Sequence, residues 1–248
     1  MSLFNVAGDQ RTSSRVQEKF LDMEHGRYGN NPFGTLGDSG RNVLALNVLL
    51  LGDRQSGRSS VGNALIGGED FQTGACVSDV SVTTDYQRRS RNFQRYFRRQ
   101  GAESDLTLRV VDTPPAAVPR PQSGVQELCP EGVHVLVLIV RADRPHGDTH
   151  LEEQVETLFG PEWRRHALLV LTYADWLKEA GLHQSVYLTQ ASDWLRALAE
   201  EVEGGVFFLD NSCDWPSIRG RPLRDRLLRL SASNHHRALT VRTSHFGL

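Results

Sequence analysis

The sequence predicts an α/β fold of three layers, in which a mostly parallel sheet has helices on both faces. Apolar runs of strand length alternate with amphipathic segments of helical period along the 248 residues. The runs are continuously apolar, which is typical of parallel strands buried on both sides. A hydrophobic fraction of 39% is enough for one sizeable core.

Each predicted element follows from its own pattern. Continuous apolar runs predict strands at Ala45–Leu51, Leu106–Val111, Val133–Val140, Ala167–Leu171 and Val206–Leu209. Helical spacing predicts helices at Ser59–Ile66, Thr149–Phe159, Ser185–Glu203 and Leu223–Leu230. The elements fill one domain at residues 43–232, between a flexible N-terminal extension (1–42) and a loose C-terminal tail (233–248). The extension is glycine-rich from Gly26 to Gly40, and one short helix is expected near Val16–Met23.

Composition and charge exclude several classes of protein. The 28 basic and 30 acidic residues give a net charge of −2, which argues against a dedicated nucleic-acid binder. The three cysteines are far apart and form no CxxC pair, so a reduced, cytoplasmic protein is expected. The longest apolar runs reach about half of the ~20 residues that a membrane helix needs, so no transmembrane anchor is expected.

Residues 88–99 combine six arginines with three aromatic side chains. Such a mixture could bind RNA. It is also typical of an edge strand whose charged side chains prevent pairing with other chains. The second interpretation is favoured, and it adds a strand to the predicted sheet.

The strongest motif follows the first predicted strand. Residues 52–59 read GDRQSGRS, which is GxxxxG[K/R]S between a strand and a helix. In such a loop the glycines let backbone N–H groups surround phosphate, and the following helix adds its positive end. We expect phosphate to contact Gly52, Asp53, Arg54, Gln55, Ser56, Gly57, Arg58, Ser59 and Ser60, and Ser59 to offer its hydroxyl to Mg²⁺.

Arg58 stands where this motif usually has lysine. Lysine is a compact point charge, whereas arginine is a longer planar fork that fits a phosphate nest differently. Only two of the 28 basic residues in the chain are lysines, Lys19 and Lys178. The arginine can therefore reflect a chain-wide preference, and nucleotide binding remains expected.

The loop and the segment after it, Val61–Gly67, resemble the start of the immunity-associated GTPase (GIMAP) family of septin-like P-loop GTPases. The resemblance extends from about Leu46 to Leu230, and Ser81–Thr84, Arg141–Asp143 and Glu179–Leu182 are closest to a divergent member of that family. It implies a P-loop GTPase fold, GTP or GDP with Mg²⁺ as cofactors, and homo-oligomers formed through the nucleotide face.

The resemblance also implies two switch segments. Thr83, or its neighbour Thr84, would contact Mg²⁺ and the γ-phosphate, although a threonine in a plain strand gives the same pattern. Asp112 would hold Mg²⁺ through water, or else cap a turn. Pro115 occupies the glycine position of the family's D-x-x-G motif. Proline has no N–H to donate to the γ-phosphate, and the loss of that charge-assisted bond costs about 1.5–3 kcal/mol.

Base recognition in the family uses a motif after a later strand, and Thr172, Tyr173 and Asp175 match it here. A carboxylate at Asp175 would accept two hydrogen bonds from guanine, which adenine cannot supply, and Tyr173 could stack on the base. Asn211 resembles the asparagine that follows the last strand. The structural alternatives are a helix cap for Asp175 and a turn residue for Asn211.

The sequence therefore predicts a guanine-nucleotide-binding protein whose hydrolysis is slow or absent, and it identifies no catalytic residue. Two alternatives stay open. One is a pseudo-GTPase interaction module that binds no nucleotide, suggested by Arg58 and Pro115. The other is a P-loop phosphotransferase for adenine nucleotides, against which the 172–175 motif argues.

Overall fold

The computed structural model describes residues 33–35, 41–73, 86–114, 121–144, 149–210 and 219–242. The strands are β1 (Phe33–Thr35), β2 (Asn42–Gly52), β3 (Gln87–Arg99), β4 (Ala102–Asp112), β5 (Val135–Arg141), β6 (Ala167–Thr172) and β7 (Val206–Phe208). The helices are α2 (Arg58–Ile66), α3 (Pro121–Leu128), α4 (Thr149–Phe159), the 3-10 helix η1 (Pro161–His166), α5 (Asp175–Glu179), α6 (Gln184–Gln190), α7 (Asp193–Glu201) and α9 (Arg221–Ser233).

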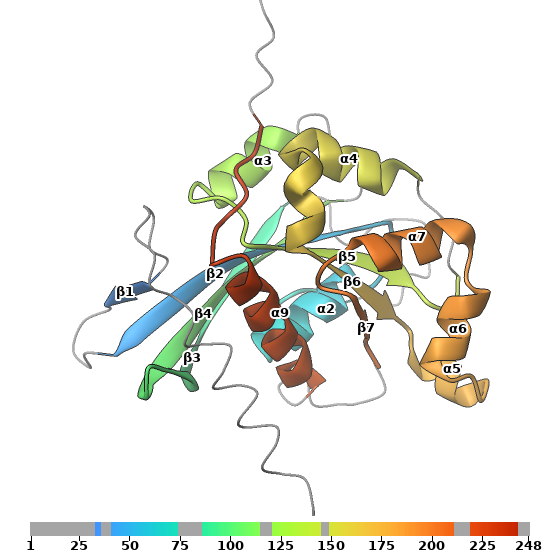
Figure 1. Cartoon of the computed structure of the whole chain (residues 1–248), viewed down its shortest axis with the longest axis horizontal. Coiled ribbons are helices and arrows are strands. Elements are labelled where there is room, and N and C mark those ends of the chain that lie inside the picture. The colour runs from blue at the N-terminus through green and yellow to red at the C-terminus, as the bar shows by residue number, and fades with distance from the viewer. Residues whose placement is uncertain are drawn as a thin grey trace, which may run out of the picture.

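The strands form one sheet in the order β3-β4-β2-β5-β6-β7, and β1 pairs with the start of β2 (Figure 1). The pairs β2–β4, β2–β5, β5–β6 and β6–β7 are parallel, whereas β3 is antiparallel to β4 and β1 to β2. The prediction of a mostly parallel sheet is confirmed. The arginine-rich segment forms the edge strand β3, as favoured from its sequence, and most of its side chains are exposed.

Alternate side chains of the central strands enter two separate cores. On β2, Leu49 and Leu51 join the core that α3, α4, α6 and α7 cover, whereas Val48 and Leu50 join the core beneath α2 and α9. Figure 1 shows these two helical layers on opposite faces of the sheet. Successive side chains of a strand point to opposite faces of the sheet. Because both faces are buried here, the sequence of these strands is continuously apolar.

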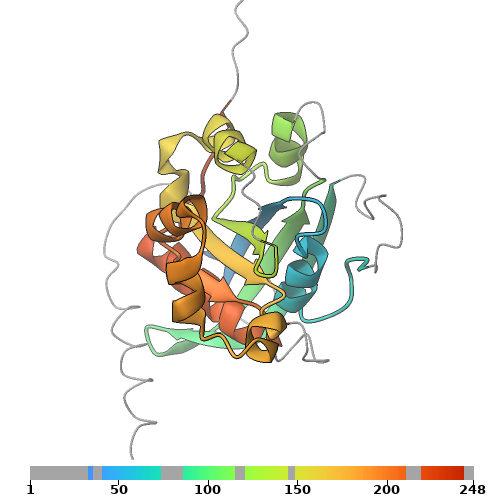
Figure 2. The same cartoon turned by 90° about the vertical axis from the view of Figure 1, so that its right-hand side faces the viewer.

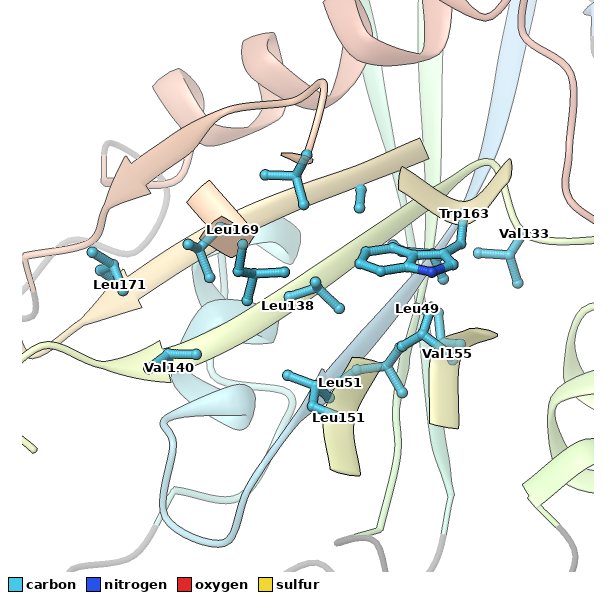
Figure 3. Close-up of a cluster of buried hydrophobic side chains, with 14 of the residues drawn as sticks. Leu49, Leu51, Val133, Leu138, Val140, Leu151, Val155, Trp163, Leu169 and Leu171 are labelled. Carbon is cyan, nitrogen blue, oxygen red and sulfur yellow. The ribbon is translucent and has the colours of Figure 1, made fainter. Parts of the chain in front are cut away.

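Trp163 is the largest fully buried side chain in the described part of the chain. Its indole lies among Leu49, Val133 and Val155 (Figure 3). The indole N–H donates to Glu156 Oε2 at 2.9 Å, so the one polar atom of the ring has a partner.

Three segments differ from the sequence-based expectation. The predicted helix 185–203 is two helices: α6 ends at Gln190 with Ala191 as its C-cap, and Ser192 caps the start of α7, with its Oγ accepting from Leu195 N–H at 3.4 Å. Phe33–Thr35, inside the predicted extension, forms β1 on β2. The predicted loose tail is ordered as far as residue 242, since Leu239 and Val133 exchange backbone hydrogen bonds of 2.8 Å and Arg242 N–H donates to Leu158 O.

The helix expected near Val16–Met23 lies outside the described residues. The three domain boundaries stay a prediction. Within the part of the chain that the structure describes, no helix has both the length and the apolar character needed to cross a bilayer.

The order of the strands identifies the edge of the sheet at which a ligand is expected to bind. From β2 the chain proceeds to β4 on one side, whereas β5, β6 and β7 follow on the other side. In open α/β sheets, ligands bind at such a reversal, outside the carboxyl ends of the strands. Figure 2 shows α2, in cyan, on one side of these strand ends, and α5, α6 and α7, in orange, on the other.

Candidate functional site

The glycine-rich loop connects the end of β2 to the start of α2. Gln55 and Gly57 have φ angles of 59° and 89°, and Ser56 N–H donates to Asp53 O at 3.2 Å, so the backbone turns tightly before the helix. A Cβ on Gly52 would lie 2.4 Å from the carbonyl oxygen of Ile139. The geometry explains both glycines of the motif: one permits close approach of β5 and the other a left-handed turn.

Arg58 turns back under this loop. Its Nε donates to Asp112 Oδ1 at 3.1 Å, and its Nη1 donates to the carbonyl oxygen of Gly52. The side chains of Arg58 and Asp112 are only 6% and 1% exposed. Burial lowers the pKa of Arg58, and the adjacent Asp112 carboxylate opposes that shift. The result is a buried ion pair that joins the loop to the end of β4.

Ser59 completes the cluster, because its Oγ donates to Asp112 Oδ2 at 2.9 Å. The structure thus brings together two of the three predicted Mg²⁺ ligands, Ser59 and Asp112. The third, Thr83, and its alternative Thr84 lie outside the described residues, as does Pro115.

This arrangement does not fit a divalent cation. Both carboxylate oxygens of Asp112 already accept hydrogen bonds from the chain, and one of the donors is itself a cation. A metal ion at the same carboxylate would lie against the guanidinium and be repelled by it. In the described ranges, no three histidine, cysteine or acidic side chains gather in a way that could hold a metal ion.

The predicted base-recognition residues lie next to the loop. Thr172, at the end of β6, donates its Oγ1–H to the carbonyl oxygen of Ser56 at 2.6 Å. Ala174 N–H donates to Leu209 O at 3.3 Å, which joins this segment to the end of β7. The sequence motifs at 52–59 and 172–175, more than 100 residues apart, therefore form one continuous edge.

Asp175 begins α5, and its Oδ1 is buried without a hydrogen-bond partner among the described residues. A buried acceptor without a donor costs about 1–3 kcal/mol, so a donor on a bound ligand or a water molecule would stabilise this oxygen. The next residue, Trp176, is 40% exposed. The predicted Asn211 lies outside the described residues; its neighbour Asp210 forms an ion pair with Lys178.

Tyr173 has a left-handed φ of 56°. The guanidinium of Arg141 lies over its ring, 4.0 Å from the ring centroid. Arg141 also binds both carboxylate oxygens of Asp143, at 2.9 and 2.6 Å, and these hydrogen bonds lower the pKa of Asp143. One face of the ring that was expected to stack on a base is thus occupied.

Sequence reasoning did not identify Arg141 as a site residue. The signal in the sequence was its position directly after the predicted strand Val133–Val140. The structure pairs it in register with Thr172. Because the carboxyl ends of neighbouring parallel strands meet at one edge, Arg141 belongs to the same edge as Thr172.

Comparisons with known proteins agree with the fold and with the motifs. The sequence model of the AIG1 family matches residues 46–216. GTPase IMAP family member 8 of Homo sapiens is 27% identical over 175 residues, which cover 67% of this chain and 24% of that protein. The chain thus spans about a quarter of the length of this relative.

Among solved structures, a dimerization-deficient mutant of Toc33 from Arabidopsis thaliana superposes with a TM-score of 0.55 at 22% identity. The match covers 79% of this chain and 88% of that one. Similarity at this level of identity shows a shared fold.

Proposed function

The chain belongs to the AIG1 family, a GIMAP-type group of P-loop GTPases, and we propose that it binds guanine nucleotides at the edge formed by residues 52–59 and 172–175. The loop would hold the phosphates, and Asp175 would select the base. We further propose that GTP hydrolysis is slow or absent and that the bound nucleotide controls association with a second copy of the chain.

The buried, unpartnered Oδ1 of Asp175 is the observation that carries this proposal. Guanine presents two adjacent donors, N1–H and the 2-amino group, whereas adenine presents an acceptor at N1 and no 2-amino group. A guanine base would therefore supply the donor that Oδ1 lacks. The hydrogen bond from Thr172 to Ser56 keeps this carboxylate beside the phosphate loop.

Slow hydrolysis is proposed from the sequence of the second switch. Pro115 has no N–H with which to sense a γ-phosphate, and no glutamine is placed near the switch to orient a water molecule. In a single-turnover assay without any partner protein, the chain should hydrolyse GTP slowly or not at all. A fast rate without any partner protein would contradict this part of the proposal.

Titration with fluorescent GDP, GTP and ATP analogues tests the binding. Guanine nucleotides should bind at least tenfold more tightly than ATP, and Asp175→Asn should weaken guanine binding about 10–100-fold, as expected for losing hydrogen bonds to a charged group. Asp193→Asn is the matched control, because Asp193 is an exposed aspartate at the start of another helix, where it pairs with Arg196. ATP preference, or equal effects of the two substitutions, would overturn the proposal.

A pseudo-GTPase that binds no nucleotide is the second candidate. The observation in its favour is the buried Arg58–Asp112 pair, because it takes the basic side chain of the loop away from its expected role on phosphate. The same titration separates the two functions. If no nucleotide binds below about millimolar concentration, which corresponds to a binding free energy weaker than about −4 kcal/mol, the pseudo-GTPase function is the correct one.

Association can be tested by light scattering on the purified chain with GDP and with a GTP analogue that resists hydrolysis. We expect the mass to double in one of the two nucleotide states. An unchanged monomer mass in both states would contradict a nucleotide-dependent association.

A further inference from the structure

Arg58 occupies the position of a cation in the candidate site. Its guanidinium lies between the carboxylate of Asp112 and the carbonyl oxygen of Gly52. Carboxylate and carbonyl oxygens, together with a hydroxyl such as that of Ser59, form the donor set that a hard divalent cation prefers. Here these oxygens surround a guanidinium that is part of the chain.

The contacts depend on the shape of arginine. The guanidinium presents N–H donors along a rigid fork, so Nε can bind Asp112 while Nη1 binds Gly52. A lysine ammonium has no donor at the Nε position and concentrates its charge at the tip of a flexible stem. Lysine at this position would be free to extend toward phosphate and would leave Oδ1 of Asp112 without this donor.

The charge of the cluster also argues against an additional metal ion. The guanidinium already neutralises the carboxylate of Asp112, and both groups are almost completely buried; Asp53 adds a smaller electrostatic attraction to the same guanidinium. A divalent cation would have to displace the guanidinium, which would then be buried without its partner at a high energetic cost.

We infer that Arg58 replaces Mg²⁺ in this protein, so that guanine nucleotides bind the chain without a divalent cation. The inference rests on the proposed function, because it concerns how that same nucleotide is held. In this arrangement Asp112 and Ser59 serve to position Arg58. The loop N–H groups and the start of α2 then supply the contacts to phosphate.

The experiment compares GDP and GTP-analogue affinities of the wild-type chain in excess MgCl₂ and in excess EDTA. The two dissociation constants should agree within about twofold, a difference of less than about 0.3 in their logarithm. Arg58→Lys should make binding depend on Mg²⁺, with at least tenfold tighter binding in MgCl₂ than in EDTA. Arg109→Lys is the matched control: Arg109 lies on β4 in a surface pair with Glu131, and its substitution should leave the Mg²⁺ independence unchanged.

The outcomes separate the inference from the proposed function. Wild-type binding that is tenfold or more tighter with Mg²⁺ overturns the inference and leaves guanine-nucleotide binding intact. Absence of binding in both buffers overturns both. The wild-type comparison decides the question even if Arg58→Lys does not fold. A second measurement is the electron paramagnetic resonance of free Mn²⁺ in the presence of GDP: the free-ion signal should not fall on addition of wild-type protein, and a fall would overturn the inference.

Discussion

The phosphate side and the base side of the candidate site differ in how their charged groups are satisfied. On the phosphate side, Asp112 is bound by Arg58 and by Ser59, so the chain supplies its own counter-ion. On the base side, Asp175 keeps a buried oxygen without a donor in the described residues. The two halves of the candidate site therefore differ in what they leave open. On the phosphate side the chain satisfies its own buried carboxylate, whereas on the base side a buried acceptor remains for a ligand.

The largest expected effect comes from breaking the phosphate side. Asp112→Ala leaves the guanidinium of Arg58 buried without its carboxylate, and removing one partner of a buried ion pair costs about 3–5 kcal/mol of unfolding free energy. Urea denaturation measures the change. Glu131→Ala, which breaks the exposed Arg109–Glu131 pair, is the control and should cost no more than about 1 kcal/mol. Similar losses in the two variants would show that the Arg58–Asp112 pair is not buried as described.

A buried histidine at the opposite end of the sheet from the candidate site makes the stability of the fold depend on pH. Burial, with a smaller contribution from His236, lowers the pKa of His134 to about 4. Its Nδ1 accepts the backbone N–H of Asn47 at 3.0 Å, and protonation of Nδ1 would remove that acceptor. Because the folded state disfavours the charged form, stability is complete above the ordinary histidine pKa of about 6.5 and is lost as the pH falls toward 4.

We expect the unfolding free energy to fall by about 2 kcal/mol between pH 7 and pH 5 through this histidine. His134→Asn offers an amide oxygen near the same position and does not titrate, so its stability should depend less on pH. Some dependence should remain, since burial also lowers the pKa of His166. Equal slopes of stability against pH in the wild type and the variant would contradict the assignment.

The contact that joins the two halves of the site gives a smaller effect. Thr172→Val removes the hydroxyl that donates to Ser56 O, which should cost about 1 kcal/mol of stability and weaken nucleotide binding. Thr107→Val is a matched control on β4, because the Thr107 hydroxyl is buried and has no partner among the described residues. The control should be neutral or stabilising. If Thr107→Val lost as much stability as Thr172→Val, the hydrogen bond from Thr172 to Ser56 would not explain the effect of the Thr172 substitution.

The smallest effect on stability is expected on the base side. Asp175→Asn should change the unfolding free energy by less than about 1 kcal/mol, because a neutral amide costs less to bury than a carboxylate, which offsets the loss of a negative charge at the start of α5. Thermal unfolding without nucleotide measures this change. A large destabilisation would show that Asp175 serves the fold and would remove the contrast with Asp112.

The sequence predicts the elements whose patterns are local. The apolar runs of β5, β6 and β7 and the helical period of α4 identify these elements to within two residues, whereas β2 and β4 begin three and four residues before their predicted starts. The break between α6 and α7 was missed because the apolar period continues across Ala191 and Ser192. The helical cap that Ser192 provides depends on one hydroxyl.

The candidate site shows the same division between local and long-range information. The loop at 52–59 was predicted from residue types and spacing and the motif at 172–175 from the family resemblance, and the structure places them side by side. The pairing of Arg58 with Asp112 and the position of Arg141 over Tyr173 were not predicted. Both contacts join residues that only the packing of separate strands brings together, so no local pattern reports them.

Two tryptophans give the molecule separate optical reporters. Trp163 is fully buried in the core, far from water, whereas Trp176 is partly exposed directly after Asp175, the residue proposed to select the base. Indole emission shifts to longer wavelength in a polar, hydrated environment, so Trp163 should report loss of the core and Trp176 should respond to a base bound beside it. The chain has four tryptophans, so each reporter is isolated only when the other three are replaced by phenylalanine. In such single-tryptophan variants, unfolding and ligand binding can be followed independently by intrinsic fluorescence, without any label on the protein or on the nucleotide.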